Sequence, residues 1–358
     1  MDKISQRQLF FFLACVAPVG KIVLLPAQLV YASGNDLLFP AVANFLLQAG
    51  AIALVMLVAR AGKTLPELLC NTFGKIAGNA VMVLLSLFFF YAALFPIIEQ
   101  KLFVQSVFYD TLPSLLVFAP YFVLSAYLCA KPASGMGRIS DMLGPISVIA
   151  FAGILAMSVP SADFSALLPA GAAGAKGFFG GTVSAMSWFF DAAIVLSFVG
   201  KFEYRKGMVW KAPLCYLAGG AAVLLFLAVF YGIFSDIALR QTFAFAKIAK
   251  YFSALTVLGR IDYVFICLFA LVMAFYTVLP LQAGTQALRT AFGNKGSPAL
   301  YSVAVNAVFF ALTVFLNDYF ASVQDTITRT LFWIFPAFSC ILPALALLLR
   351  RNPREKTA

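Results

Sequence analysis

The chain has 358 residues, of which 63% are hydrophobic and only 11% are charged, and its mean hydropathy is +0.97. Soluble domains contain about 45–50% hydrophobic residues, so this composition excludes an ordinary soluble enzyme and indicates a membrane protein with many spans. The formal net charge is +11. Because the basic residues gather between apolar segments, we interpret this charge as a signal of topology, with anionic lipid and no nucleic acid as its partner.

Ten apolar segments are each long enough to cross roughly 30 Å of hydrocarbon as a helix. They comprise residues 8-32, 38-60, 79-108, 114-131, 141-160, 180-200, 213-235, 259-282, 299-317 and 327-349. Most of the 25 Lys and Arg residues fall on the side that also carries both chain ends, which places both termini in the cytoplasm. The sequence therefore predicts a single all-α polytopic domain over residues 1–358, with ten transmembrane helices.

The first apolar segment is interrupted near its centre by Ala17, Pro18 and Gly20. Proline removes a backbone hydrogen bond and glycine tolerates unusual dihedral angles, so the helix can open there. Lys21 follows at once, about 18 Å into a helix that rises 1.5 Å per residue and so near the middle of a bilayer. A charge at that depth is costly and marks a candidate functional site. Broken helices at this depth form the substrate sites of secondary transporters.

Ten spans with both ends on one side divide into five plus five, and two homologous halves would then have opposite orientations. The first span of the second half, the sixth of the chain, is also interrupted. Asp191 lies near its centre, flanked by Ser187, Trp188 and Phe190. If the first helices of the two halves pack together, Asp191 approaches Lys21, and the two charges form either a structural ion pair or part of a ligand site.

The third span carries further polar groups. Tyr91 and Glu99 are about two turns apart and share one face of a helix to within roughly 80°. Glu99 either relays protons or contacts a ligand amine, or it marks with Lys101 the outer end of a long tilted helix. Together with Asp191 and Lys21, Glu99 is a candidate proton or ion relay.

The region around the eighth span allows alternative interpretations. Residues 238–252 place three bases among apolar side chains, which predicts an amphipathic helix on the outer surface. It is either a lid over the site or a simple interfacial helix. Arg260 and Asp262 are interpreted as interfacial anchors, while Tyr276 and Thr277 either line a cavity or pack.

Several kinds of chemistry are excluded. The chain has no histidine, so a histidine proton relay, a histidine metal site and a His-dependent triad are absent. Its six cysteines are scattered without a C-x-x-C pair, and no nucleotide-binding fingerprint occurs. We therefore expect no enzyme activity, no cofactor and no metal.

A set of motifs occurs in the order typical of one family. These motifs are Ile4-Ser5-Gln6-Arg7-Gln8-Leu9-Phe10, the broken span with Gly20, Gly62-Lys63-Thr64-Leu65-Pro66-Glu67, Phe73-Gly74-Lys75-Ile76-Ala77-Gly78, Tyr91 with Glu99, and Gly259-Arg260-Ile261-Asp262. Over essentially the whole chain, this order resembles the GerAB-type B subunits of endospore nutrient germinant receptors.

The resemblance implies a fold similar to amino acid/polyamine/organocation transporters, with the five-plus-five inverted repeat of LeuT-like proteins and broken spans 1 and 6. It also implies a small nutrient, often an amino acid, bound between those spans with help from spans 3 and 8. The expected partners are an A-type membrane subunit and a C-type lipoprotein subunit in the spore inner membrane. The chain departs from a plain permease because Lys21 occupies the break itself and aromatic residues precede Asp191.

The chemistry of the expected site follows from its charges. Freed amides after the first break, reinforced by Lys21, favour a carboxylate, and Asp191 or Glu99 favours an ammonium. Trp188 adds a cation-π contact. If Lys21 and Asp191 neutralise each other, a neutral or weakly polar ligand fits instead. The candidate ligand-binding residues are Ala17, Pro18, Gly20, Lys21, Tyr91, Ser187, Trp188, Phe190 and Asp191.

Three functions fit these features. A germinant-receptor subunit converts binding into a conformational change in its partners. A proton-coupled amino acid transporter uses the same fold for alternating access, with Glu99 or Asp191 carrying the proton. In a membrane scaffold, the buried charges would be purely structural.

Overall fold

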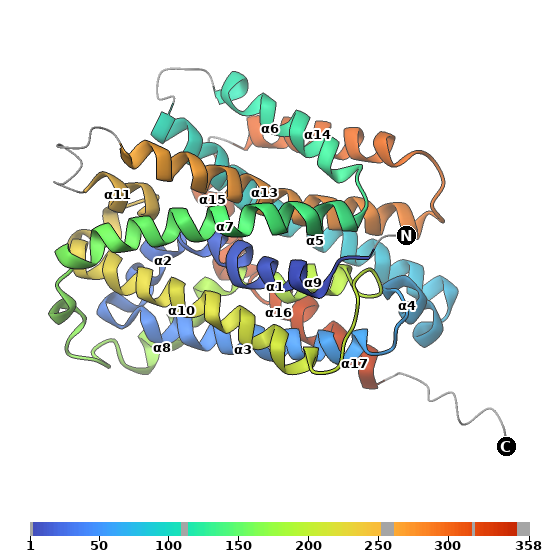
Figure 1. Cartoon of the computed structure of the whole chain (residues 1–358), viewed down its shortest axis with the longest axis horizontal. Coiled ribbons are helices and arrows are strands. Elements are labelled where there is room, and N and C mark those ends of the chain that lie inside the picture. Colours follow the sequence, from blue (N-terminus) through green and yellow to red (C-terminus); the bar gives the residue numbers. More distant parts are fainter. Residues whose placement is uncertain (1–2, 109–113, 252–260, 317–318, 349–358) are drawn as a thin grey trace.

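Helices form nearly all of the regular structure in the computed structural model (Figure 1), which describes residues 3–108, 114–251, 261–316 and 319–348. The longer helices are α3 (Leu38–Ala59), α5 (Lys75–Phe108), α7 (Ala133–Ser158), α10 (Met208–Phe234), α13 (Ile261–Ala291) and α14 (Pro298–Phe315). The shorter ones are α1 (Gln6–Phe11), α2 (Leu25–Ser33), α4 (Leu65–Phe73), α6 (Ser114–Cys129), α8 (Gly174–Ala185), α9 (Asp191–Ser197), α11 (Ala244–Lys250), α15 (Phe320–Asp325), α16 (Ile334–Pro336) and α17 (Leu342–Leu348). Short π or 3-10 segments include η1 (Phe12–Val16), η2 (Ala17–Lys21), η6 (Met186–Trp188), η7 (Ser235–Arg240), η8 (Thr326–Thr330) and η9 (Ala337–Ile341).

Within the described ranges, seven helices are long and apolar enough to cross a membrane, or up to nine if each of two bent helix pairs counts as one span. The bent pairs are Gln6–Lys21 with Leu25–Asp36 and Ala321–Thr330 with Ile334–Leu348. The predicted fourth segment corresponds to α6, which has only 16 residues. The all-helical, multi-pass character predicted from hydropathy is therefore confirmed, while the count of ten stays a prediction.

Several helices extend beyond the apolar segments that predicted them. The fifth segment was expected to begin at 141, but α7 begins at Ala133, and the sixth was expected at 180, but α8 begins at Gly174. The eighth segment was expected to end at 282, but α13 continues to Ala291. Hydropathy marks the part of a helix that lies in hydrocarbon, whereas backbone hydrogen bonding continues into the polar turns beyond it.

The most extensive contacts between helices are formed between the first half of the chain and the second. α5 lies along α13, and α3 lies along α10. In the same way, α6 packs beside α14 and α2 beside α8 (Figure 1). Each pair joins helices that are five spans apart in the predicted order.

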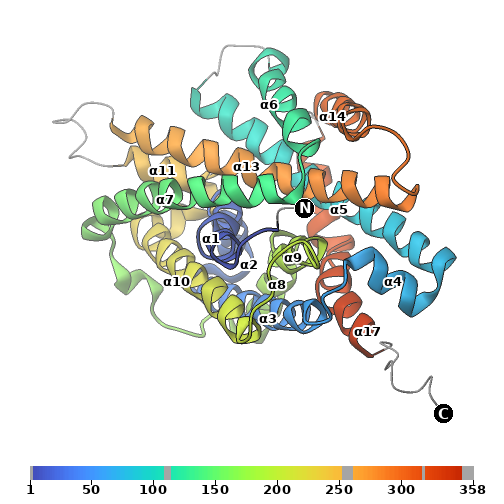
Figure 2. The same ribbon diagram turned by 45° about the vertical axis from the view of Figure 1, so that its right-hand side comes forward.

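The first span lies between α7 and α10, as Figure 2 shows for α1. Two glycines permit this close approach. A Cβ at Gly144 of α7 would lie 2.6 Å from a ring carbon of Phe11, and one at Gly219 of α10 would lie 2.6 Å from Cγ of Pro18. Small residues allow helices within a membrane to pack closely, so these positions fix the first span against its neighbours.

The end of the bundle that carries the N-terminus is held by a chain of hydrogen bonds. The backbone N–H of Ile4 donates to the Lys201 carbonyl at 2.9 Å, and the N–H of Glu203 donates to the Ile4 carbonyl at 2.9 Å. Lys201 Nζ donates to Gln286 Oε1 at 2.8 Å, and Gln286 Nε2 donates to the Lys131 carbonyl at 3.2 Å. These contacts connect the beginning of span 1 and the end of span 6 to α13.

Candidate functional site

Span 1 loses α-helical geometry over residues 12–24. It passes through the π-helical η1 and the 3-10 segment η2, and it is non-helical at 22–24. Pro18 lies in the first turn of η2, where its missing N–H costs little. The helical parts Gln6–Lys21 and Leu25–Asp36 meet at 61°. The predicted interruption at residues 17–21 lies within this segment, which begins five residues earlier and ends three residues later.

Span 6 is also broken, immediately before its predicted acid. The backbone leaves helical geometry at Phe189 and Phe190, and α9 begins at Asp191. Gln48 of α3 bridges the break, because its Nε2 donates to the Phe189 carbonyl at 2.7 Å and its Oε1 accepts from the Ala192 N–H at 3.2 Å. This side chain replaces backbone hydrogen bonds that the break removes.

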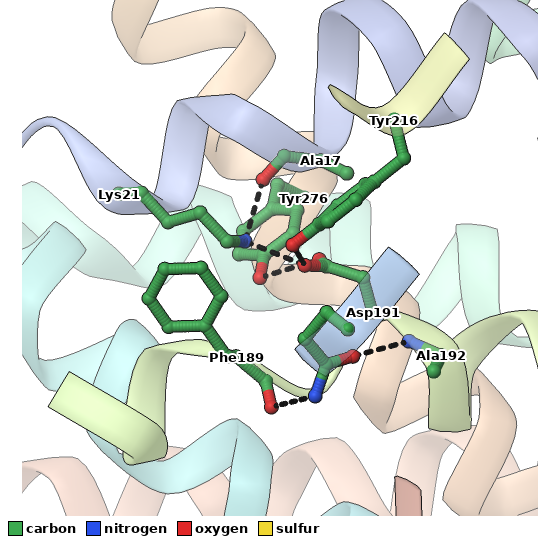
Figure 3. A network of polar contacts seen from close by, with 8 residues as sticks. Ala17, Lys21, Phe189, Asp191, Ala192, Tyr216 and Tyr276 are labelled. Atoms are coloured by element: carbon green, nitrogen blue, oxygen red, sulfur yellow. Dashed lines mark hydrogen bonds and ion pairs between the residues drawn. The ribbon is translucent and has the colours of Figure 1, made fainter. Parts of the chain in front are cut away.

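The two breaks are joined by an ion pair (Figure 3). Lys21 Nζ lies 2.7 Å from Asp191 Oδ2, and both side chains are 0% exposed. Nζ also donates to the Ala17 carbonyl at 2.9 Å. It lies 5.3 Å from the centroid of the Phe189 ring and 5.4 Å from that of Tyr276, within cation-π range. The structure therefore brings together the two charges that the sequence placed in separate breaks.

Two tyrosines complete the surroundings of the Asp191 carboxylate. Tyr216 of α10 donates to Oδ2 at 2.8 Å, and Tyr276 of α13 donates to Oδ1 at 3.3 Å (Figure 3). Gly20 allows Tyr276 to approach, since a Cβ there would lie 2.8 Å from Cζ of the ring. A buried ion pair is tolerable only when further hydrogen bonds satisfy its remaining lone pairs and protons, and these hydroxyls supply them.

Tyr216 and Gln48 were not predicted from the sequence. Both are wholly or almost wholly buried, at 0% and 1% exposure. The sequence did offer a signal for both residues. Each is a polar side chain inside an otherwise apolar segment, which is the criterion that identified Asp191. Tyr276 was predicted only as a possible cavity-lining residue, whereas the structure gives it a direct hydrogen bond to the acid.

Glu99 lies beside the first break and not at the outer end of its helix. It is 1% exposed, and its Oε1 accepts the backbone N–H of Leu24 at 2.9 Å. Lys101 is 2% exposed and donates to the Thr313 carbonyl at 2.8 Å. Burial of both side chains counts against their interpretation as markers of the outer end, and α5 runs on for seven more residues to Phe108. The sequence predicted that backbone amides freed by the first break would bind a ligand carboxylate. One of these amides, the Leu24 N–H, instead donates to the Glu99 carboxylate.

Three other predicted site residues form no hydrogen bond to the ion pair in the part of the chain that the structure describes. The Tyr91 hydroxyl and Ser187 Oγ are buried without a hydrogen-bond partner among the described residues, and the Trp188 indole N–H lies toward Glu99. The Tyr91 ring lies 5.5 Å from the Phe335 ring, and the Phe190 ring lies 6.0 Å from it. The site therefore has a charged part whose groups are paired and an aromatic part with unpaired polar atoms.

The predicted amphipathic helix at 238–252 is shorter than expected. It comprises η7 and the seven-residue α11, which packs against the bundle. The N–H of Ala244 donates to the Val23 carbonyl in the first break at 2.9 Å, and the Phe245 ring stacks on Phe269 at 4.0 Å. This segment thus contacts the site directly.

The structure also bears on the interpretations of Asp262 and Thr277 in span 8. Asp262 is 3% exposed, so it is not an interfacial anchor, while Gly259 and Arg260 lie outside the described residues. Thr277 Oγ1 lies 2.8 Å from the hydroxyl of Tyr121 in a buried contact. It serves packing between α13 and α6.

The described part of the chain offers little else for chemistry at this site. All six cysteines are free thiols. Among the described residues, no group of three or more Cys, Asp and Glu side chains could hold a metal ion.

Comparison with known proteins assigns the chain to a family. Residues 3–334 match the Spore_permease family, described as spore germination protein. The match spans both breaks, the ion pair and α5, and it confirms the resemblance predicted from the order of motifs. No curated protein matches the chain. Because the match covers nearly the whole of this multi-pass helical chain, the protein belongs to the spore permease family of spore germination proteins.

Proposed function

We propose that the chain is the ligand-binding subunit of an endospore nutrient germinant receptor. In this proposal a small nutrient, an amino acid, binds between the breaks of spans 1 and 6. The observation that carries the proposal is the Lys21–Asp191 ion pair, which is 0% exposed and joins the two breaks. A link between two interrupted helices is a bistable element that a ligand can bias.

A zwitterionic amino acid is complementary to this ion pair. Its carboxylate takes the place of Asp191 beside Lys21, and its ammonium takes the place of Lys21 beside Asp191. The exchange leaves no buried charge without a partner, but it separates the two breaks. In the state in which the two breaks are separated, Lys21 and Asp191 each form an ion pair with the ligand. In the state in which the two side chains pair with each other, neither is free to do so. That difference in affinity is what shifts the population.

Unpaired polar atoms near the breaks supply further ligand contacts. The Ser187 and Tyr91 hydroxyls are buried donors without partners, and the Trp188 N–H lies toward Glu99. Trp188 packs edge-on against Phe95 at 5.0 Å, so the same region has apolar walls for a side chain. Ala17, Pro18 and Gly20 of the first break belong to the same proposed site, since the Ala17 carbonyl accepts from Lys21 and Gly20 lies against Tyr276.

The same proposal includes a LeuT-like fold of ten spans in a five-plus-five inverted repeat, contained in one domain. Packing of helices five spans apart, α5 with α13 and α3 with α10, supports it. Both termini are placed in the cytoplasm, and the chain in the spore inner membrane. Its partners there are an A-type membrane subunit and a C-type lipoprotein subunit.

Spores that lack the chain and are complemented with variants test this function. We expect wild-type protein to restore germination by at least one amino acid and Lys21→Met to abolish it, with Gly50→Ala as a matched control on the exposed side of α3. Germination of the Lys21→Met spores by the same amino acid would rule out the carboxylate role. Uptake of that amino acid into proteoliposomes, abolished by collapse of the proton gradient, would instead identify a proton-coupled transporter.

A further inference from the structure

A cavity lies away from the ion pair, at the end of the bundle that carries the N-terminus. It has a volume of about 520 Å³ and lies between span 1 and α10. The residues that define its character are Arg7, Phe10, Phe11, Cys15, Arg205 and Cys215. None of them belongs to the proposed nutrient site.

The cavity has an apolar wall and a charged mouth. Phe10, Phe11, Cys15 and Cys215 are half-buried and form the wall. The mouth is formed by side chains that are largely exposed, 72% for Arg7 and 69% for Arg205. A groove of this kind suits an amphiphile with a polar head and an apolar chain.

Two arginines and one acid, Arg7, Arg205 and Glu203, line the mouth. Asp141 pairs with Arg7, and the exposed Lys3 and Lys206 are near the two arginines in the sequence. Arg7 pairs with Asp141, and Arg205 lies 3.4 Å from Glu203. Each guanidinium has five N–H donors and uses one nitrogen for its carboxylate, so donors remain for a phosphate.

The wall covers most of the depth of one half of a bilayer. From Arg7 to Cys15 the chain advances eight residues, or about 12 Å at 1.5 Å per residue. The hydrocarbon core of a bilayer is about 30 Å thick, so one leaflet contributes about 15 Å. An acyl chain whose phosphate lies at Arg7 would therefore run along the wall as far as Cys15.

We propose that this groove is a binding site for one anionic phospholipid, with its phosphate on Arg7 and Arg205 and an acyl chain against Phe11 and Cys15. The lipid fills the space beside α1, the part of span 1 that precedes the first break. By binding the conformation in which α1 is docked between α7 and α10, it stabilises that conformation, and the stabilisation grows with the ratio of free lipid concentration to its dissociation constant. The site is independent of the proposed nutrient ligand.

Lipid-dependent stability of the full chain tests the site. Protein purified in detergent is titrated with phosphatidylglycerol or with phosphatidylcholine of the same acyl chains, and the unfolding temperature is measured. We expect phosphatidylglycerol to raise it more than phosphatidylcholine does, and this difference to disappear in Arg7→Gln/Arg205→Gln. The matched control Arg60→Gln/Lys63→Gln removes two exposed charges at the same end, outside the groove, and should retain the difference. Equal responses of both double variants would overturn the proposal.

Thiol labelling gives a second measurement that does not depend on the stability of a variant. One protein retains Cys215 alone and another retains Cys267 alone, with the remaining cysteines changed to serine. Cys267 is exposed on α13, far along the chain from the groove. We expect phosphatidylglycerol to slow N-ethylmaleimide labelling of Cys215 several-fold and to leave Cys267 unchanged. Equal slowing at both positions would indicate a general micelle effect and contradict a site in the groove.

Discussion

Lys21 and Asp191 lie 170 positions apart in the sequence, yet their charged atoms are 2.7 Å apart at the point where both of their helices are broken. Neither side chain has exposed surface. Lys21 or Asp191 alone would be an unpaired charge buried in an apolar bundle. Because the two charges pair, each one offsets the cost of burying the other. The ion pair is therefore both a structural link and the place where a charged ligand has most effect.

Removing one partner of this ion pair should destabilise the protein strongly. Lys21→Met and Asp191→Leu each leave an uncompensated buried charge, which costs about 3–5 kcal/mol. The double variant leaves none, and we expect it to recover most of that loss. Thermal unfolding in detergent measures all three, and strictly additive losses would show that the charges do not interact.

Gly20 is expected to tolerate no side chain. In Gly20→Ala the new Cβ meets the Tyr276 ring, so the ring must move away from Asp191 and lose its hydrogen bond. We expect a loss of about 1–3 kcal/mol, as for overpacking elsewhere. Gly50→Ala is the control, because a Cβ there meets nothing within 4 Å. Equal unfolding temperatures for the two variants would contradict the close approach of Tyr276.

Gln48 should be needed for the second break. Gln48→Leu removes both the donor to the Phe189 carbonyl and the acceptor of the Ala192 N–H. Each buried group left without a partner costs about 1–3 kcal/mol. Gln28→Leu is the matched control, since Gln28 is half-buried and its contact with Gln324 is long, at 3.4 Å. A smaller loss of stability in Gln48→Leu than in Gln28→Leu would count against the bridging role.

Glu99 should act first as a hydrogen-bond acceptor. Glu99→Gln keeps a carbonyl oxygen for the Leu24 N–H and should change the unfolding free energy by less than about 1 kcal/mol, while Glu99→Leu should lose about 1–3 kcal/mol. If Glu99 also carries protons, Glu99→Gln abolishes proton-driven uptake in proteoliposomes without loss of stability. Equal destabilisation by both substitutions would mean that the charge, and not the hydrogen bond, is required.

Lys201 gives a pH dependence outside the membrane-spanning segments. Burial lowers the pKa of its amine to about 8. Between pH 8 and the ordinary lysine pKa of about 10.4, the unfolded chain binds more protons than the folded one, so stability should rise with pH. The rise should be absent in Lys201→Gln and present in the exposed-residue control Lys206→Gln. An identical pH profile for wild type and Lys201→Gln would contradict the burial of a neutral amine.

The sequence predicted the charged centre of the site because Lys21 and Asp191 are conspicuous in apolar segments. The groups that complete it depend on packing. Tyr216 and Gln48 are ordinary residues of apolar spans until α10 and α3 bring them to the breaks. Hydropathy reports how apolar a helix is, but it does not report which face turns toward a neighbour.

The two interpretations of Glu99 could not be separated from the sequence for a related reason. The predicted segment 79-108 ends where α5 ends, at Phe108. Its hydropathy does not show whether Glu99 faces lipid, water or another helix. The structure buries both Glu99 and Lys101 against neighbouring helices.

In the proposed mechanism, an amino acid binds by replacing the Lys21–Asp191 ion pair. Each of the common amino acids is added to the purified wild type and to Lys21→Met/Asp191→Leu, and binding is followed by the shift in unfolding temperature. We predict that at least one amino acid stabilises the wild type and that none stabilises the double variant, although the variant remains folded. Stabilisation of both proteins by the same amino acid, or of neither by any, would contradict the claim.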